Sequence, residues 1–529
     1  MAQTEESGSE AVPGTAVRRP IRWWPVPLVL LVGIIVEVWA LQRYGRQRQD
    51  QNLASAAVAL GTLLLLLLWG ILLSRMRWKV RLALFAAFVG VVGLAGSLFQ
   101  IHGVTGDLVP ILRWRWSQTS GPAPDPEPIS GAKPAQNLPL PTNSYPQFLG
   151  PDRTGMLPGP RLARDWKGEP PRLLWRRPMG LGWSGFAIEG TRAITQEQQG
   201  VEEAVNCYDL LSGRLVWNHT YPARFQSTLA GEGPRATPTI AGERVYTLGS
   251  TGILKCLELE TGRAVWSKNI LEENHGRLEE WGMSSSPLVV DDLVVVSAGG
   301  RDNRSLVAYR TSDGSFVWGG GSDGAGYSSP ALVTLMGIRQ IIIFNSGGIF
   351  AHEPATGTIL WQYHWPGGHP HVSTPIVLPG DRLLISSGYG FGSELVQIAR
   401  DAAGTLTATR IWKSTRLKAK FTDVIYRNGF IYGLDDGVMV CLDAADGAQK
   451  WKQGRYGHGQ EILVGDLLLM GAESGEILLL DPTPQESREL TRFSALHGKT
   501  WNPPALAGPY LVVRNDKEAA CYQLPILPP

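Results

Sequence analysis

The chain has 529 residues, a formal net charge of +2 and only four cysteines. A balanced charge leaves no electrostatic footprint for nucleic acid. Four cysteines without a CxxC pair exclude a disulfide scaffold and the common zinc and thiol-redox motifs. The 62 glycines and 19 tryptophans favour many short strands joined by tight turns.

Three long apolar runs follow a polar N-terminus (1–20) that we expect to be disordered. They cover about Trp23–Leu41, Leu53–Leu73 and Leu82–Val104, and each is long enough to cross a bilayer as a helix. We expect a multi-pass anchor in the cytoplasmic (inner) membrane. Glu37 is either a functional intramembrane acid or a side chain near the helix end that reaches the interface.

Cations flanking the runs set the expected orientation. With the N-terminus inside, seven arginines and lysines lie on the cytoplasmic side and five outside, which is a weak positive-inside preference. Three crossings then place the remainder of the chain in the periplasm.

The segment after the third run changes character twice. "GDLVPILRWRW" predicts an interfacial segment up to residue 116, and seven prolines between Pro122 and Pro141 predict a stiff linker over 117–144. The folded domain is expected to cover 145–529.

This domain is built from a repeat. "CYDLLSGRLVW" begins at Cys207, "CLELETGRAVW" at Cys256, "AYRTSDGSFVW" at Ala308, "AHEPATGTILW" at Ala351 and "CLDAADGAQKW" at Cys441. The copies share a small residue, usually an acid two positions on, a glycine four later and a tryptophan four after that. We expect the glycines to adopt a positive φ in a hairpin and the tryptophans to pack on the neighbouring unit.

Weaker copies complete the set. The chain ends on "CYQLP" without its own tryptophan, and the missing half is found in "RLLWRRP" at the start of the domain. The terminal aromatic positions, 39 to 52 residues apart, are Trp175, Trp217, Trp266, Trp318, Trp361, Trp412, Trp451 and Phe493. This spacing predicts an all-β propeller of eight four-stranded blades, closed by the strand that carries Trp175.

The repeat resembles the tryptophan-docking motif of the PQQ-like, quinoprotein-type eight-bladed propellers, and "SYPQFLGPDRTG" at 144–155 looks like the leading segment of membrane-anchored bacterial members. The resemblance implies the fold, which is used both by dehydrogenases and by non-enzymatic scaffolds such as the outer-membrane assembly lipoprotein. The dehydrogenases carry two adjacent cysteines over pyrrolo-quinoline quinone and hold Ca²⁺ beside a catalytic aspartate. This chain has no Cys-Cys pair, and we assign no catalytic, cofactor or metal-binding residue.

All four cysteines, Cys207, Cys256, Cys441 and Cys521, fall at one repeat position, where other copies have alanine. We interpret them as small apolar fillers in a buried slot. His364, His369 and His371 could hold a metal, but their Gly/Pro-rich surroundings favour an ordinary loop.

One register position suggests a functional surface. It lies three residues before the proline that begins each innermost strand, or before the aligned residue. The side chains there are Trp183, Arg235, Ser284, Tyr327, Val372, Lys420, His458 and Trp501. Because innermost strands line the central channel, these residues should surround one of its mouths. They either bind a ligand or protein partner, with Trp183, Arg235, Tyr327, Lys420, His458 and Trp501 as candidates, or plug the channel by contacting one another.

The sequence therefore predicts a membrane-tethered propeller that binds or scaffolds another envelope protein or peptide, without nucleic acid and without an expected cofactor. A PQQ-dependent, calcium-containing membrane oxidoreductase for alcohols or sugars is the alternative.

Overall fold

The structure is a computed structural model that describes residues 20–44, 47–116, 138–227 and 229–528. Two compact units are present. One contains residues 1–100 and 112–116, and the other contains residues 101–111 and 117–529. The expected disorder of 1–20 and most of the expected linker fall outside the described residues.

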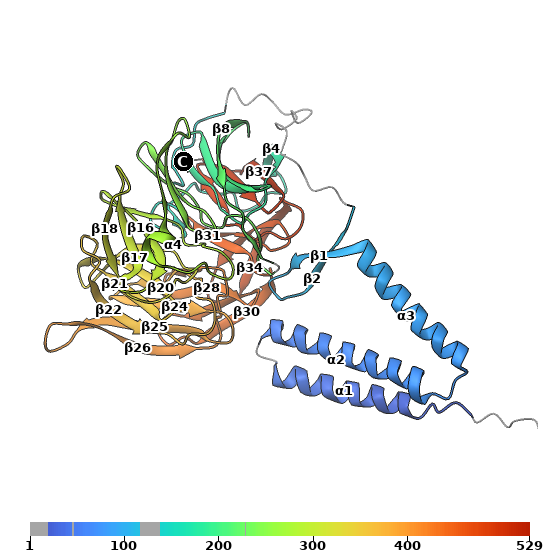
Figure 1. The fold of residues 1–529 in the computed structure, drawn as a ribbon. Helices are drawn as coiled ribbons and strands as arrows, with labels where there is room; N and C mark the ends of the chain where they lie inside the picture. The colour runs from blue at the N-terminus through green and yellow to red at the C-terminus, as the bar shows by residue number, and fades with distance from the viewer. Residues whose placement is uncertain (1–19, 45–46, 117–137, 228, 529) are drawn as a thin grey trace, which may run out of the picture. The chain divides into compact units, whose positions relative to one another are not determined.

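The first unit is helical (Figure 1). Its helices are α1 (Pro25–Arg43), α2 (Arg48–Leu68), which continues as the π-helical turn η1 (Trp69–Leu73), and α3 (Trp78–Leu98). All three helical segments are long and apolar enough to cross a membrane. Within this unit Ser55 Oγ donates a 2.5 Å hydrogen bond to Glu37 Oε1, so the one acid of the first run is paired with the second helix.

The third helix is shorter than its apolar run. It ends at Leu98, and the strand β1 (Phe99–Val104) follows and pairs with β2 (Pro110–Trp114). Gly103 has a φ of +142°, which a helix cannot accommodate, and Pro110 begins the returning strand. Hydrophobicity alone could not separate a helical from an extended continuation here.

The second unit contains seven four-stranded sheets and one five-stranded sheet among its described residues, together with a short two-stranded pair, β9 (Gln226–Ser227) and β10 (Gly231–Glu232). The first four sheets are β5–β8 (Ala187–Glu189, Arg192–Gln199, Glu202–Asp209, Leu215–Pro222), β11–β14 (Thr239–Ala241, Arg244–Leu248, Ile253–Glu258, Ala264–Asn269), β15–β18 (Leu288–Val290, Leu293–Gly300, Arg304–Arg310, Phe316–Gly320) and β19–β22 (Ala331–Leu335, Ile338–Asn345, Gly348–His352, Ile359–His364).

The remaining sheets are β23–β26 (Ile376–Leu378, Arg382–Ser387, Gly392–Arg400, Leu406–Ser414), β27–β30 (Val424–Arg427, Phe430–Asp435, Val438–Asp443, Gln449–Arg455), β3 (Met156–Leu157) with β31–β34 (Gln460–Val464, Leu467–Gly471, Glu476–Pro482, Ser487–Ser494), and β35–β37 (Ala505–Ala507, Tyr510–Arg514, Glu518–Gln523) with β4 (Arg172–Pro178). A short helix, α4 (Ile270–Asn274), begins the acidic insertion after β14.

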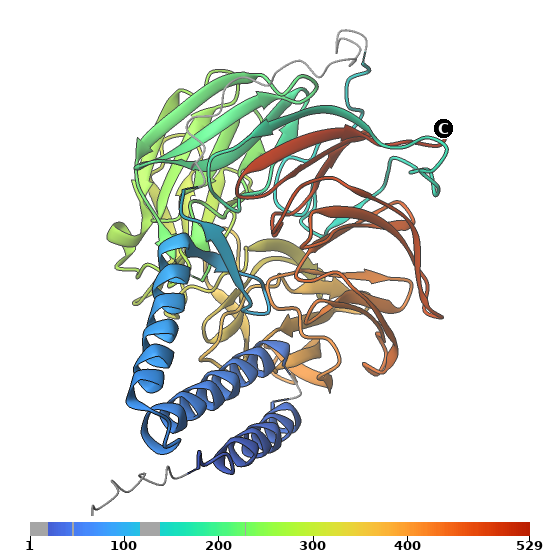
Figure 2. The same ribbon diagram turned by 90° about the vertical axis from the view of Figure 1, so that its right-hand side faces the viewer.

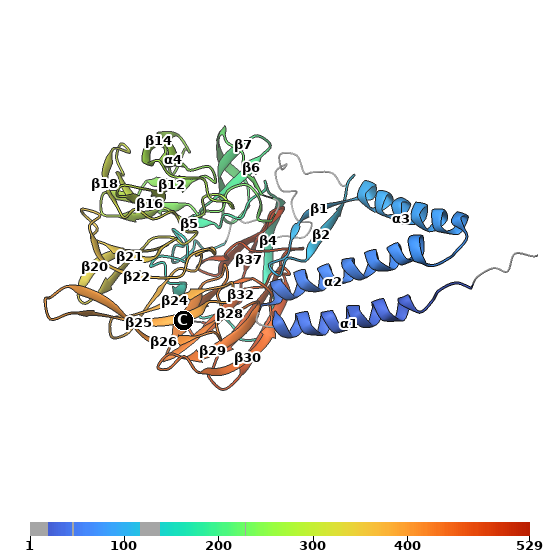
Figure 3. The ribbon, with the colours of Figure 1, turned by 60° about the horizontal axis from the view of Figure 1, so that its bottom comes forward.

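The sheets follow one another around a ring in colour order (Figure 2). The innermost strands of neighbouring sheets contact one another at β5 with β11, β11 with β15, β15 with β19, β23 with β27, β27 with β31, and β35 with β5 across the two ends of the domain. β4 pairs antiparallel with β37, opposite Cys521 and its neighbours (Figure 3). The predicted closure of the ring by the Trp175 strand is therefore confirmed.

Each repeat tryptophan lies on the outermost strand of its sheet, and all of them except Trp361 donate a hydrogen bond to the next sheet. Trp217 Nε1 donates to Leu259 O at 2.8 Å, one residue after the repeat acid of the following sheet. The equivalent donors and acceptors are Trp175 to Leu210, Trp266 to Thr311, Trp318 to Pro354, Trp412 to Ala444 and Trp451 to Thr483. Trp361 differs and donates to the side chain of Gln340, on β20 of its own sheet, at 2.5 Å.

The repeat glycine has two roles. Gly262 has the predicted positive φ, +69°, and a Cβ at this position would lie 2.4 Å from the Trp217 ring. Glycines 213, 314, 357 and 447 show the same combination of positive φ and a tryptophan from the preceding sheet. The glycine thus permits the turn and also leaves space for the neighbouring indole.

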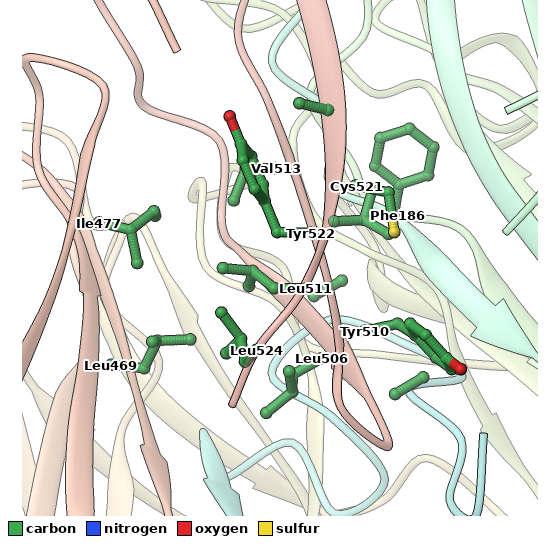
Figure 4. Packing of buried hydrophobic residues seen from close by; sticks show 14 of the residues in the cluster. Phe186, Leu469, Ile477, Leu506, Tyr510, Leu511, Val513, Cys521, Tyr522 and Leu524 are labelled. Carbon is green, nitrogen blue, oxygen red and sulfur yellow. The ribbon is translucent and has the colours of Figure 1, made fainter. Parts of the chain in front are cut away.

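The four cysteines are free and buried. In the register, Cys256 is the partner of Trp266, as Ala308 is of Trp318, which explains why only small residues occur there. Cys521 lies beside Phe186, which comes just before β5, in a buried cluster that also contains Tyr510, Leu511 and Tyr522 from the C-terminal strands (Figure 4).

Candidate functional site at the channel mouth

The predicted register residues lie in the loops that lead into the innermost strands. Trp183 and Trp501 pack together with ring centroids 5.0 Å apart. Phe421 lies 4.9 Å from both the Trp501 and the His458 ring. Trp183, Trp501, Phe421 and His458 thus form one continuous aromatic cluster, which we call the aromatic wall. Its members precede the first sheet, the last sheet and the two sheets that begin with β27 and β31.

A second aromatic group faces the mouth from the middle of the domain. Tyr327 stacks on Trp281 at 5.3 Å, and Tyr389 lies 6.5 Å from Trp281. Burial raises the pKa of Tyr327 to about 12, so its hydroxyl stays protonated at neutral pH. Lys420 Nζ lies 5.2 Å from the centre of the Tyr389 ring, a cation–π distance.

Arg235 is directed toward its own loop rather than outward. Its guanidinium donates to Ala230 O and Gly231 O, each at 3.0 Å, and to Gly233 O, and it lies 4.7 Å from the Phe225 ring. At Arg235, the structure therefore fits the interpretation that the side chains plug the channel through contacts within the protein.

Lys499 and Glu473 supply most of the charge beside the aromatic wall. Lys499 Nζ lies 4.0 Å from the centre of the Trp501 ring and 4.7 Å from that of Trp183. Burial lowers the pKa of Lys499 to about 8. Glu473 accepts from Trp501 Nε1 at 2.9 Å and from the backbone N–H of His458 at 3.0 Å.

The mouth also holds a peptide loop from outside the repeats. We define the hairpin loop as residues 104–109, between β1 and β2; it belongs to residues 101–111, which form part of the propeller unit. Gly106 N–H donates to Glu473 Oε1 at 2.8 Å, and Lys420 Nζ donates to Gly106 O at 2.7 Å. The predicted interfacial segment thus contains a loop that contacts the propeller.

The sequence register missed Glu473, Lys499, Phe421, Trp281 and Tyr389. Glu473 lies between β32 and β33, away from any lead-in position. Lys499 and Phe421 lie within two residues of Trp501 and Lys420, so a wider register window would have included them. Trp281 and Tyr389 belong to non-repeating loops and carry no periodic signal.

The channel behind the mouth is polar. In two sheets a carboxylate replaces the proline that begins the innermost strand, giving Asp423 and Glu461. Neither Glu461 oxygen has a hydrogen-bond partner among the described residues. Burial, and secondly the Asp423 charge, raise the pKa of Glu461 to about 8. Burial also raises the pKa of Asp423 to about 6.

Arg153, from the segment that precedes the first sheet, is buried at the starts of the innermost strands. It donates to Ser286 O at 3.1 Å, Pro330 O at 2.9 Å and Thr239 Oγ1 at 3.1 Å, and it also contacts Pro287 O. One buried guanidinium therefore joins lead-in residues of three sheets.

The described residues were compared with the metal and quinone site that the family resemblance implies. No group of three His, Cys, Asp or Glu able to hold a metal occurs among the described residues. His371 has both ring nitrogens engaged, with Asn345 O at 2.6 Å and Pro366 O at 3.2 Å. His369 stacks on Phe391 at 3.6 Å. The sequence has no pair of adjacent cysteines, and no calcium ligands are assigned.

Comparison with known proteins gives one recurrent similarity. A family model described as outer membrane protein assembly factor BamB matches residues 201–453. BamB of Moranella endobia is 23% identical over 353 residues, 60% of this chain and 81% of the relative. BamB of Bordetella pertussis is 22% identical over 360 residues, 65% and 84% of the two chains.

Among solved structures, the quinohemoprotein alcohol dehydrogenase of Comamonas testosteroni superposes with a TM-score of 0.54 at 12% identity. The match covers 73% of this chain and 81% of the dehydrogenase. At this identity the similarity shows the fold alone.

Proposed function

Because the propeller of this chain is of the PQQ-like repeat type, we propose that it binds another envelope protein through its channel mouth while the helical unit tethers it to the membrane. The observation that carries this proposal is that the mouth holds a peptide loop through matched donors and acceptors. The relatives are described as assembly factors and not as enzymes, which supports a protein-binding function over a catalytic one.

The mouth has the composition of a protein-recognition surface. Tryptophan, tyrosine and arginine or lysine concentrate there, with Trp281, Tyr327 and Tyr389 on one side and Trp183 and Trp501 on the other. Such aromatic and cationic groups dominate binding energy at protein interfaces.

Site-specific photo-cross-linking tests the proposal. A benzophenone amino acid replaces Trp281 at the mouth or, as the control, Ile411, which is 46% exposed on the outer strand β26. We expect an adduct with a defined envelope protein from position 281 and none from 411 in intact cells. Equal adducts from both positions, or none from the mouth, would contradict the proposal.

The propeller is proposed to lie in the periplasm, on the far side of the inner membrane from the N-terminus. Fusion of alkaline phosphatase after residue 120 tests this, because the phosphatase becomes active only when it is exported from the cytoplasm. We expect phosphatase activity from this fusion and little fluorescence from a matching green-fluorescent fusion; the reverse pattern would overturn the assignment.

The quinoprotein alternative is not favoured by the residues present, since the calcium donors and the cysteine pair are not matched. Titration of the purified chain with pyrrolo-quinoline quinone and Ca²⁺ is the direct check. Saturable binding accompanied by dye-linked oxidation of an alcohol or sugar would replace the binding function with an enzymatic one.

A further inference from the structure

The hairpin loop is held by side chains from three neighbouring sheets. Lys420, before β27, donates to Gly106 O at 2.7 Å, and Lys499, before β35, donates to Val104 O at 3.1 Å. Glu473, between β32 and β33, accepts the Gly106 N–H at 2.8 Å. A loop bonded through its backbone in this way is recognised mainly by its shape.

Only glycine fits at the centre of the loop. A Cβ on residue 106 would lie 2.0 Å from His458 Cδ2 and 2.5 Å from Cγ. The His458 ring is 2% exposed and packs against Phe421, so it has little space to move away. The mouth therefore excludes any turn with a side chain at this position.

The next position selects an acid. The Asp107 carboxylate lies 3.3 Å from His458 Nε2 and 3.9 Å from the guanidinium of Arg455. Lys420 and Lys499 add two further cations around the loop. Glycine followed by an acid is thus the pair that satisfies both the space and the charge of the mouth.

We propose that the channel mouth is a receptor for tight turns in which glycine precedes an acidic residue, and that the hairpin loop is its resident ligand. A partner that presents such a turn binds only when residues 104–109 leave the mouth. This inference rests on the proposed protein-binding function and specifies the chemistry of the partner.

The test uses the full chain in lipid nanodiscs and a fluorescent peptide of residues 101–111, followed by polarisation. The Gly106→Val chain should release its own loop, because the added side chain clashes with His458. We expect this variant to bind the peptide at least about tenfold more tightly than the wild-type chain, whose mouth is occupied. Asp107→Lys serves as a second releasing variant, and the Tm of each shows that the propeller remains folded.

Two matched controls identify the site. Adding Lys420→Ala to the Gly106→Val chain should abolish the gain, whereas Arg410→Ala, on β26 away from the mouth, should leave it unchanged. A peptide with Asp107→Asn should bind at least about tenfold more weakly, as expected when a charged partner is removed from a partly buried pair.

The outcomes separate the two proposals. The turn receptor is overturned if the wild-type chain and both releasing variants bind the peptide equally. It is also overturned if the Lys420→Ala substitution leaves peptide binding unchanged. If the peptide binds as expected but position 281 yields no adduct in cells, the receptor stands and the partner function falls. If position 281 yields an adduct in cells but the peptide does not bind, the partner function stands and the turn receptor falls.

Discussion

Glu461 provides a direct test of the polar channel. Its side chain is 2% exposed, and neither oxygen accepts a hydrogen bond from the described residues. Burial raises its pKa to about 8, so the folded chain retains a proton that the unfolded chain releases near pH 4.5. The contribution of Glu461 to the free energy of unfolding should therefore be greatest below pH 4.5 and fall as the pH rises to 8.

The size of this effect follows from the shift. One proton bound only by the folded state gives a slope of about 1.4 kcal/mol per pH unit, or on the order of 4 kcal/mol between pH 4.5 and 8. Glu461→Gln keeps the shape of the side chain and removes the titration. We expect the variant to gain stability relative to the wild type as the pH rises, by several kcal/mol at pH 8.

The assay is urea unfolding of the purified chain, followed by tryptophan fluorescence at pH 5 to 9. Glu476→Gln is the matched control on the same sheet, because this carboxylate is 35% exposed and pairs with Arg492 at 3.4 Å. Parallel curves of unfolding free energy against pH for the wild type and Glu461→Gln would refute the reasoning.

Three further outcomes are expected. Trp266→Ala should lower the free energy of unfolding by about 3–5 kcal/mol. Trp266→Phe keeps an aromatic ring but loses part of the indole and its 3.0 Å bond to Thr311 O, so it should cost about 1–3 kcal/mol; thermal unfolding measures both. The four thiols should be inert to Ellman's reagent at pH 8 until denaturant is added, because they are buried and the pKa of Cys256 is raised to about 11. Arg153→Met should cost on the order of 3 kcal/mol by leaving several carbonyls unpaired, while Arg488→Met at the surface should change stability by less than about 0.5 kcal/mol.

The repeat made most of the propeller predictable. Its tryptophans and glycines interact between neighbouring sheets, so their spacing reports the sheet boundaries directly. Cys256 and Ala308 occupy the same position of the repeat, each opposite a tryptophan. Comparison of the copies therefore showed from the sequence that the position requires a small side chain.

The mouth was only partly predictable. The register identified Lys420, His458 and Trp501, but the loop that they hold contains Gly106, more than 300 residues away in the chain. Nothing periodic links that position to Glu473. A Gly-Asp pair predicts a turn, but the partner of a turn depends on tertiary placement, which repeat spacing cannot supply.

The pairing of β4 with β37 also has a consequence during synthesis. Roughly 340 residues separate Pro178 from Glu518, which at ~5–20 residues per second is about 17–70 s of translation. Throughout that time β4 presents an unpaired edge, a structure prone to wrong pairing between chains. Protection of this edge until β37 emerges would reduce such wrong pairing, and a truncation that removes Glu518–Gln523 would leave β4 without its partner strand.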